Sequence, residues 1–478
     1  MSKKNVKLIV HFAIMVAIYL IISHLPHSEP LTDTGIKVLA IMVAAIYGWC
    51  TIDTVVPSIL AVITFGLVSG SGVAGAVLTG SGSFLIMMIL AMLMICGIMI
   101  HTGLAKVFAE KIINSKIANG RPWILMLLIL IAAGVSSLIL PGLAVVLVVW
   151  DIAYGIFETC GYQKGEKWPT VILIAICAAP TFGMVCSHVS SGVIPNVAII
   201  QAIDPSLRLN ALSFTGFGII QLAIFIPVCL LIIKFIFKPD VSKLKNYKAP
   251  DEKVRMNTDQ KRALWILIAF IVLITVPDFL PAGSVTSFLQ QFGIIGWGFL
   301  FVAVALLIRN KDGSHFITFK QITDASVYWD MLFMLASIQV VCGGLSNPEF
   351  GISTWMMQIL QPLVMHLGPF GVVAVLMLLG LVVTNLLDSA VTTFVFTAIT
   401  YTVANAVGLN TMGLFSILLH VSAFGMLLPA CSPPLTLLYG KVEDGWVSNK
   451  DILKSAWPYI TACAVICILI GYATMNLY

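Results

Sequence analysis

TNLLDSAVTTF, residues 384–394, places a carboxylate and five hydroxyl or amide side chains inside a long apolar run. The carboxylate is Asp388. A charged side chain at membrane depth costs about 2.5–3.5 kcal/mol on insertion scales, so it indicates a functional site by default. In the alternative interpretation, Asp388 caps the helix that follows it. Both interpretations depend on the environment in which this run lies.

The composition defines the class of protein. Of 478 residues, 59% are hydrophobic and 10% are charged, and the mean hydropathy is +1.04. Soluble domains carry about 25% charged residues. Many apolar runs are long enough to cross a hydrocarbon core of about 30 Å, and the first, Leu8 to Leu25, lacks a signal-peptide cleavage site. The ten cysteines contain no CxxC pair and are interpreted as small hydrophobic residues. The sequence therefore predicts an all-α polytopic membrane protein.

The basic residues orient the predicted spans. If the N-terminus is cytoplasmic, runs 123–158 and 368–406 must each enter and leave on one side, as re-entrant hairpins. Every Lys and Arg except Lys37 and Arg208 then faces the cytoplasm, as the positive-inside rule requires. About eleven transmembrane helices remain, which places the C-terminus outside the cell membrane. The net charge of +5 is explained by this topology and by anionic lipid headgroups, so no nucleic-acid partner is expected.

The order of elements recurs along the chain, which indicates two inverted repeats. The predicted division is scaffold helices 1–82, a first repeat 83–237 with hairpin 123–158 and broken helix 168–200, a basic cytoplasmic linker 238–262, scaffold helices 263–308, and a second repeat 309–478 with hairpin 368–406 and broken helix 413–440. Inverted repeats with broken helices are typical of secondary transporters whose site lies near the midplane. Interrupted backbone at that depth is tolerated only where it lines a cavity or is buried in protein.

Four stretches resemble the divalent anion/sodium symporter family of the ion transporter superfamily. VYWDMLFMLASIQVVCGGLSNPEFGISTW (327–355) is similar to that family's Trp-Asp span and the turn after it, and IMIHTGLAKVFAEKI (98–112) to its first-half counterpart. GVIPN (192–196) and CSPPLTLLYG (431–440) resemble its two helix breaks. The resemblance covers roughly 80–475. It implies a homodimeric carrier of the elevator type, with hairpins and broken helices moving against a scaffold.

The resemblance also implies where substrate and ion bind. The family carries a Ser-Asn-Thr triplet at each hairpin tip, in contact with sodium and a substrate carboxylate. Here the second tip has Leu387-Asp388-Ser389 instead. In the first hairpin, Ser136-Ser137 and Leu140-Pro141-Gly142 are both candidates, and the choice stays open.

Helix chemistry explains why such tips bind ligands. Half-helix N-termini favour anions, whereas carbonyl and hydroxyl oxygens suit Na⁺. The predicted substrate-binding residues lie at the hairpin tips and helix breaks: Ser136, Ser137, Ser190, Ser191, Asn196, Asn385, Ser389, Thr392, Ser432 and Pro433. The predicted site for a coupling Na⁺ or H⁺ comprises Asp388, Ser389, Thr384 and Cys431. In the alternative interpretation, these small polar residues only pack helices together.

The sequence predicts a secondary carrier of a small anion, most readily a di- or tricarboxylate, by cation-coupled symport or by exchange. No Walker motif, HExxH or nucleophile–base set is present, so neither an enzyme nor an ATP-driven pump is expected. No cofactor is expected beyond the coupling ion. His188 and His420 lie in the broken spans, either as core residues or with a proton or substrate role. Two alternatives remain: a cation/proton antiporter of related fold, which Asp388 supports, and an anion exchanger without cation coupling.

Overall fold

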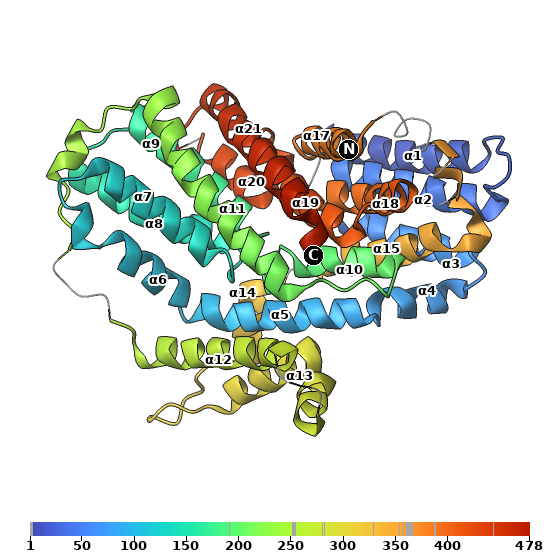
Figure 1. Ribbon diagram of the computed structural model, residues 1–478, viewed down its shortest axis with the longest axis horizontal. Helices are drawn as coiled ribbons and strands as arrows, with labels where there is room; N and C mark the ends of the chain where they lie inside the picture. Colours follow the sequence, from blue (N-terminus) through green and yellow to red (C-terminus); the bar gives the residue numbers. More distant parts are fainter. Residues whose placement is uncertain are drawn as a thin grey trace.

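The protein is all-helical in the part of the chain that the structure describes (Figure 1). This computed structural model describes residues 3–190, 192–250, 255–279, 281, 283–327, 329–352, 354–356, 358–359, 367–386, 389–442 and 444–478. Within these ranges the extended pairing is limited to an isolated bridge between Arg309 and His315. The predicted all-α class is confirmed.

The helices follow the apolar runs of the sequence. The first half contains α1 (Lys3–Ser23), α2 (Asp33–Thr51), α3 (Val55–Val68), α4 (Gly72–Ser81), α5 (Phe84–His101), α6 (Leu104–Ile113), α7 (Pro122–Ser136), α8 (Gly142–Cys160), α9 (Lys167–Gly183), α10 (Ile194–Ile203) and α11 (Ala211–Leu231). The second half contains α12 (Thr258–Thr275), α13 (Ser284–Leu307), α14 (Phe319–Ser326), α15 (Trp329–Ser346), α17 (Pro369–Thr384), α18 (Ser389–Val407), α19 (Thr411–Ser422), α20 (Pro433–Gly440) and α21 (Asn449–Thr474).

Each half contains a helical hairpin followed by an interrupted helix. The run 123–158 forms α7 and α8, and the run 368–406 contains α17 and α18. The predicted broken helices are α9 with α10 and α19 with α20. Gly and Pro interrupt them for a physical reason, since Gly183 ends α9 and proline occupies the first turn of both α10 and α20, where its missing N–H is tolerated.

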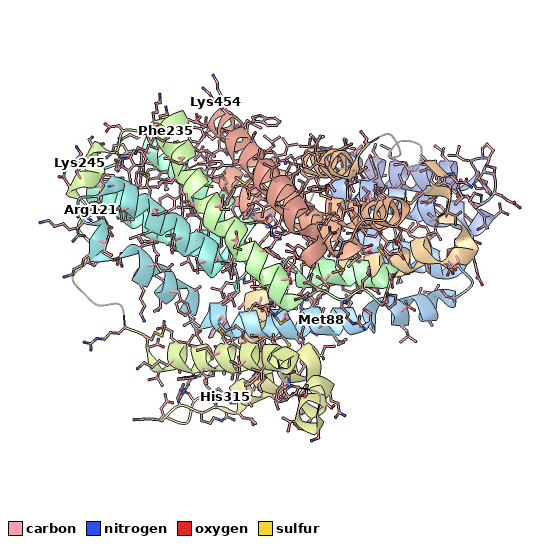
Figure 2. The ribbon with its side chains drawn as sticks, viewed as in Figure 1. Met88, Arg121, Phe235, Lys245, His315 and Lys454 are labelled. Carbon is pink, nitrogen blue, oxygen red and sulfur yellow. The ribbon has the colours of Figure 1, made fainter. Side chains whose placement is uncertain are left out.

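Several of the loops that carry basic residues meet at one end of the molecule. The N–H of Gly120 donates to the carbonyl of Tyr247 (3.3 Å), and Lys243 Nζ lies 2.7 Å from Glu166. The hydrogen bond from Lys243 lowers the pKa of Glu166, so this carboxyl group is charged at neutral pH. Arg121, Lys245 and Lys454 all lie at this end (Figure 2). The base of the α7–α8 hairpin, the first part of the linker (residues 238–250) and the start of α21 therefore share one side of the fold.

Burial separates the interrupted helices from the peripheral ones. Every residue from Trp168 to Gly183 in α9 is buried, and so is every residue from Met412 to Ser422 in α19. By contrast, α1 exposes apolar side chains such as Leu8, Ile9 and Ile21. An apolar surface of this kind suits contact with lipid, because a helix that is hydrophobic all round is stable only in a core or a membrane.

Six segments within the described residues are long and apolar enough to cross a bilayer: Val6–Ser23, Gly72–His101, Gly142–Cys160, Ala211–Phe237, Ser389–Val407 and Asn449–Leu477. The pair α14 and α15, bent by 69°, would make a seventh. Several other apolar helices have only 10–17 residues, because breaks and turns divide the apolar runs. Two of the six are α8 and α18, the second arms of the hairpins. The length of a helix alone therefore does not distinguish a membrane-crossing helix from one arm of a re-entrant hairpin.

Cysteine labelling tests the topology directly. Single cysteines at 245 and 441 are expected to react only with reagents that reach the cytoplasm, and one at 368 only with reagents from outside. Cysteines at 120 and 160 should label from the same side, because both flank one hairpin. Labelling of 120 and 160 from opposite sides would show that the α7–α8 hairpin crosses the membrane, and the inverted repeat would then be wrong.

Candidate functional site

The tip of the second hairpin is fastened to the second helix break by Asn385. The side chain of Asn385 is 3% exposed. Its Nδ2 donates to the carbonyls of Leu381 (2.8 Å) and Phe424 (3.2 Å), and its Oδ1 accepts from the N–H of Met426 (2.8 Å). Asn385 therefore saturates backbone groups that the interruption of α19 leaves without helical partners. Its role in this state is to position the tip.

Two threonines strengthen the same junction. Thr384 Oγ1 donates to the carbonyl of Ser422, and Thr393 Oγ1 lies 2.7 Å from Ser422 Oγ. Thr392 is fully buried, whereas Ser389, at the start of α18, is half-exposed. Leu387 and Asp388 lie outside the described residues. Of the predicted residues of the second tip, the structure thus brings Thr384 to Ser422, at the end of α19, and Asn385 to the segment after it.

The second helix break is closed by Ser432, whose Oγ donates to the carbonyl of Gly425 (3.0 Å). The expectation that this break presents several N–H groups to an anion needs correction. Pro433 and Pro434 have no N–H, and the N–H groups of Leu435 and Thr436 both donate to the Ser432 carbonyl (3.0 Å each). The thiol sulfur of the predicted cation ligand Cys431 accepts from the N–H of Leu428 (3.3 Å).

The first hairpin tip packs against the first break through small residues. Ser137, fully buried, donates through Oγ to the carbonyl of Gly134 (2.7 Å), whereas Ser136 is half-buried. A Cβ atom at Gly183 would lie 2.2 Å from Ser137 Oγ, so only glycine fits there. In α8, the N–H groups of residues 142–144 have no acceptor among the described residues. This tip therefore offers an anion the free donors that α20 lacks.

The polar residues of the first break bond locally. Ser190 Oγ donates to the carbonyl of Met184, and Asn196 Nδ2 donates to that of Gly192 (2.7 Å). Ser191 lies outside the described residues. Both side chains therefore stabilise the bend between α9 and α10.

The two breaks lie side by side, so four half-helices begin near one place. The rings of Phe182 and Phe424 are 6.1 Å apart, and Cys177 Sγ lies 3.8 Å from the Pro434 carbonyl. A Cβ on Gly142, at the start of α8, would lie 3.6 Å from the Pro180 carbonyl. The first turns of α8 and α20 thus contact α9. α10 packs against α18 and runs in the direction opposite to α8 and α20 (Figure 1). Four positive helix ends converge on this junction.

A cavity of about 720 Å³ borders the first break. Its polar lining residues are Ser83, His188, Gln201, Arg208 and Gln339. Of these five, only His188 was considered for a site role on the basis of the sequence. The sequence did contain one signal for Arg208, which is one of only two basic residues predicted to lie outside. Gln339 gave no such signal, because a lone amide in an apolar span is compatible with packing.

The two histidines have different surroundings. His188 lines the cavity, and its Nδ1 lies 2.8 Å from Thr215 Oγ1. His420 is 1% exposed and packs between the rings of Phe182 and Phe214, with Nδ1 bonded to the Ser416 carbonyl (2.8 Å). His420 is thus a core residue in this state, and only His188 adjoins space that a ligand could occupy.

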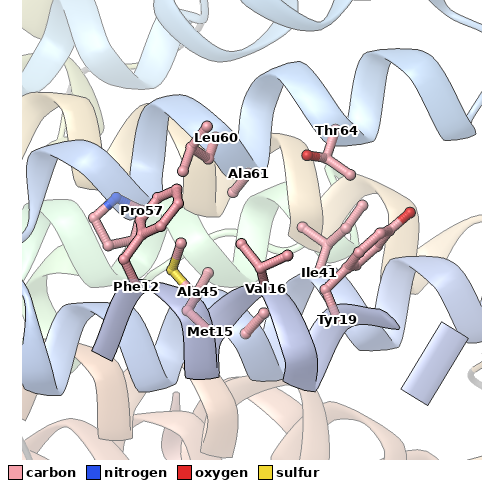
Figure 3. Close-up of a pocket in the computed structure, with 11 residues that line it drawn as sticks. Phe12, Met15, Val16, Tyr19, Ile41, Ala45, Pro57, Leu60, Ala61 and Thr64 are labelled. Atoms are coloured by element: carbon pink, nitrogen blue, oxygen red, sulfur yellow. The ribbon is translucent and has the colours of Figure 1, made fainter. Parts of the chain in front are cut away.

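A second pocket, of about 190 Å³, lies between α1, α2 and α3 (Figure 3). Apolar side chains such as Phe12, Met15 and Ile41 form most of its wall, and Tyr19 and Thr64 contribute the hydroxyl groups. Its lining includes no lysine, arginine or histidine, and it does not adjoin a helix break. It therefore does not suit an anion.

A helical membrane protein in which paired helix breaks meet belongs to the class of secondary transporters. The sequence matches the citrate transporter (CitMHS) family over residues 34–425. The chain therefore belongs to that family, which bears out the predicted membership of the ion transporter superfamily. It is 21% identical to an uncharacterized transporter of Haemophilus influenzae over 377 residues, 76% of each chain. It is also similar in fold to the crystal structure of the YdaH transporter of Alcanivorax borkumensis, with a TM-score of 0.58, 15% identity and 98% of each chain covered.

Proposed function

We propose that this protein is a secondary active carrier that moves a di- or tricarboxylate across the cell membrane, coupled to Na⁺ or H⁺. The observation that carries this proposal is the convergence of the N-termini of α8, α10, α18 and α20. Positive partial charges at helix N-termini favour carboxylates, and the free N–H groups of residues 142–144 supply donors. Membership of the citrate transporter family supports the same class of substrate.

The coupling cation would bind where the opposite helix ends meet. α7, α9, α17 and α19 end at the same junction, and their last carbonyls are the hard oxygen ligands that Na⁺ prefers. Asp388, between Asn385 and Ser389 in the sequence, would add a carboxylate that binds Na⁺ or a proton. A cation there offsets the repulsion between Asp388 and an anionic substrate. This is the physical basis proposed for coupled transport.

Transport would proceed by movement of the hairpins and interrupted helices as one unit against α1–α5 and α12–α15. The contacts of Asn385 and Ser137 hold each tip to its own half's break, so the tips and breaks would move together. A homodimer formed through the peripheral helices would keep the scaffold fixed in the membrane.

Uptake into proteoliposomes tests this function. Purified protein should accumulate radiolabelled citrate, malate or succinate when a Na⁺ or pH gradient is imposed, with one of the two gradients effective. Protein-free liposomes are the control. If Na⁺ drives proton movement and no anion enters, the protein is instead a cation/proton antiporter. If exchange occurs without any cation dependence, the coupling proposal is wrong.

Replacement of Ser432 by alanine is expected to raise the apparent KM about tenfold. It removes the hydrogen bond that closes the break, and leaves the Gly425 carbonyl without its partner. A lost hydrogen bond that leaves a buried group unsatisfied costs about 1–3 kcal/mol. The measurement is initial uptake rate against substrate concentration. Ser448→Ala, at the N-cap of α21, is the control because its bond to Asp451 lies at the basic end. Equal KM in both variants would place the substrate site elsewhere.

A further inference from the structure

The 720 Å³ cavity borders the first helix break and the connection that follows α10. Met88 of α5, Ile274 of α12, Ile294 of α13 and Gln339 of α15 form one side of it. α10 and the connection after it, which carries Arg208, form the other side. The labelled Met88 lies well away from Arg121 and Lys245 (Figure 2). The cavity therefore lies between the interrupted-helix unit and its neighbours, and its lining includes Arg208, which the sequence predicts to face outward.

The charge of this cavity is positive. Its lining contains Arg208 and no aspartate or glutamate. Arg208 Nη1 donates to the carbonyls of Pro205 (2.7 Å) and Leu207 (3.4 Å), and no described carboxylate pairs with it. The nearby Asp204 bonds instead to Ser206 (2.6 Å) and Tyr401 (3.4 Å). A guanidinium has five N–H donors in a fork that matches a carboxylate, so Arg208 retains donors for a ligand.

A second polar group on the opposite wall has an unmet hydrogen-bonding requirement. Gln339 lines the cavity from α15, and its Oε1 is buried without a hydrogen-bond partner. A buried acceptor in this state costs free energy, which a ligand hydroxyl would recover. Gln201, by contrast, already donates to the Leu207 carbonyl (3.1 Å). Arg208 and Gln339 thus provide one carboxylate-binding group and one hydroxyl-accepting group in the lining of the same cavity.

The geometry points to a second anion subsite in this cavity, outside the junction where the four helix N-termini converge, at which Arg208 binds a carboxylate of the entering substrate. Gln339 accepts a hydrogen bond from a hydroxyl on the same molecule, and His188 marks the inner end, where the cavity reaches the first break. This inference rests on the proposed function, because it requires that the protein transports a small carboxylate. It adds a recognition step outside the main site.

Arg208→Gln tests the subsite in vesicles with the outer face exposed. The variant should raise the KM for malate uptake about three- to tenfold and leave kcat unchanged, since a peripheral charge acts mainly on association. In the wild type, added salt should lower kcat/KM. In the variant, kcat/KM should depend much less on salt. Lys37→Gln, on α2, removes the other basic residue predicted to lie on this side and is the matched control. Its KM should equal that of the wild type. Equal KM values for the two variants would overturn the subsite.

A cysteine variant keeps the test valid if the glutamine variant folds poorly. Arg208→Cys should show the raised KM. A thiol reagent that carries a quaternary ammonium should return the KM to the wild-type value, whereas a reagent that carries a sulfonate should not. Unmodified wild type treated in the same way controls for the native cysteines. Equal effects of both reagents would mean that charge at this position is irrelevant.

Gln339→Leu tests the hydroxyl-accepting group. The variant should raise the KM for malate, which carries a hydroxyl, about threefold more than the KM for succinate, which lacks it. Its melting temperature should not fall, because the replaced oxygen has no partner to lose. Equal changes for the two substrates would contradict the role of Gln339. If the wild type transports no carboxylate, the proposed function fails; if it does so but the Arg208 variants behave as the wild type, only the subsite fails.

Discussion

Replacement of Asn385 by alanine is expected to reduce uptake about a hundredfold while the protein still reaches the membrane. The substitution removes three hydrogen bonds: two fasten the second hairpin tip to residues 424–426, and the third goes to the Leu381 carbonyl of the same hairpin. The N–H of Met426 and the carbonyl of Phe424 then remain buried without these partners. Each such group costs about 1–3 kcal/mol, and a loss of about 3 kcal/mol from the transport-competent arrangement corresponds to a hundredfold in rate.

The measurement is initial uptake rate per unit of purified protein, together with the melting temperature in detergent. Asn405→Ala is the matched control, because Asn405 lies on the same hairpin, is exposed, and donates to the Tyr401 carbonyl (2.9 Å) within its own helix. Its uptake should match the wild type. Wild-type uptake by the Asn385 variant would show that the tip does not depend on this contact during transport.

Replacement of Asp388 by asparagine is expected to remove most of the dependence of transport on the driving cation. The change keeps the size of the side chain and removes its charge. Coupling between sites typically amounts to about 1–3 kcal/mol, or 5- to 150-fold, so cation activation should fall within that range. Exchange of substrate across the membrane should persist, since the four helix N-termini remain. Asp388 itself lies outside the described residues, and this prediction rests on its place in the sequence.

Two profiles distinguish the ions. If Asp388 binds a proton, the pH profile of uptake flattens in the variant; if it binds Na⁺, Na⁺ activation at fixed pH is lost. Asp444→Asn is the control, because Asp444 pairs with Lys441 (3.1 Å) in a loop at the basic end and is half-exposed. Its profiles should match the wild type. If the Asp388 variant keeps both wild-type dependences, this carboxylate is only a helix cap.

The sequence by itself determined the class of protein and the positions of its elements. Apolar runs and Gly-Pro interruptions depend on local physics, since burial in lipid requires helices and proline or glycine ends them. For this reason α9 with α10 and α19 with α20 occur where 168–200 and 413–440 predicted them. Thr384, Asn385 and Thr393 are likewise conspicuous in the sequence because they interrupt an apolar run, whereas a role of this tip in binding stays a prediction.

The tertiary structure decided what those residues contact. The sequence could not show that Asn385 bonds to residues 424–426, because these contacts join segments about 40 residues apart and depend on packing. The two donors missing at Pro433 and Pro434 are, by contrast, readable from the sequence, because proline has no N–H. The sequence also could not show that Arg208 and Gln339, 131 positions apart in the chain, line one cavity. A cavity is a property of how helices meet, and no periodicity along the chain encodes which side chains face each other across it.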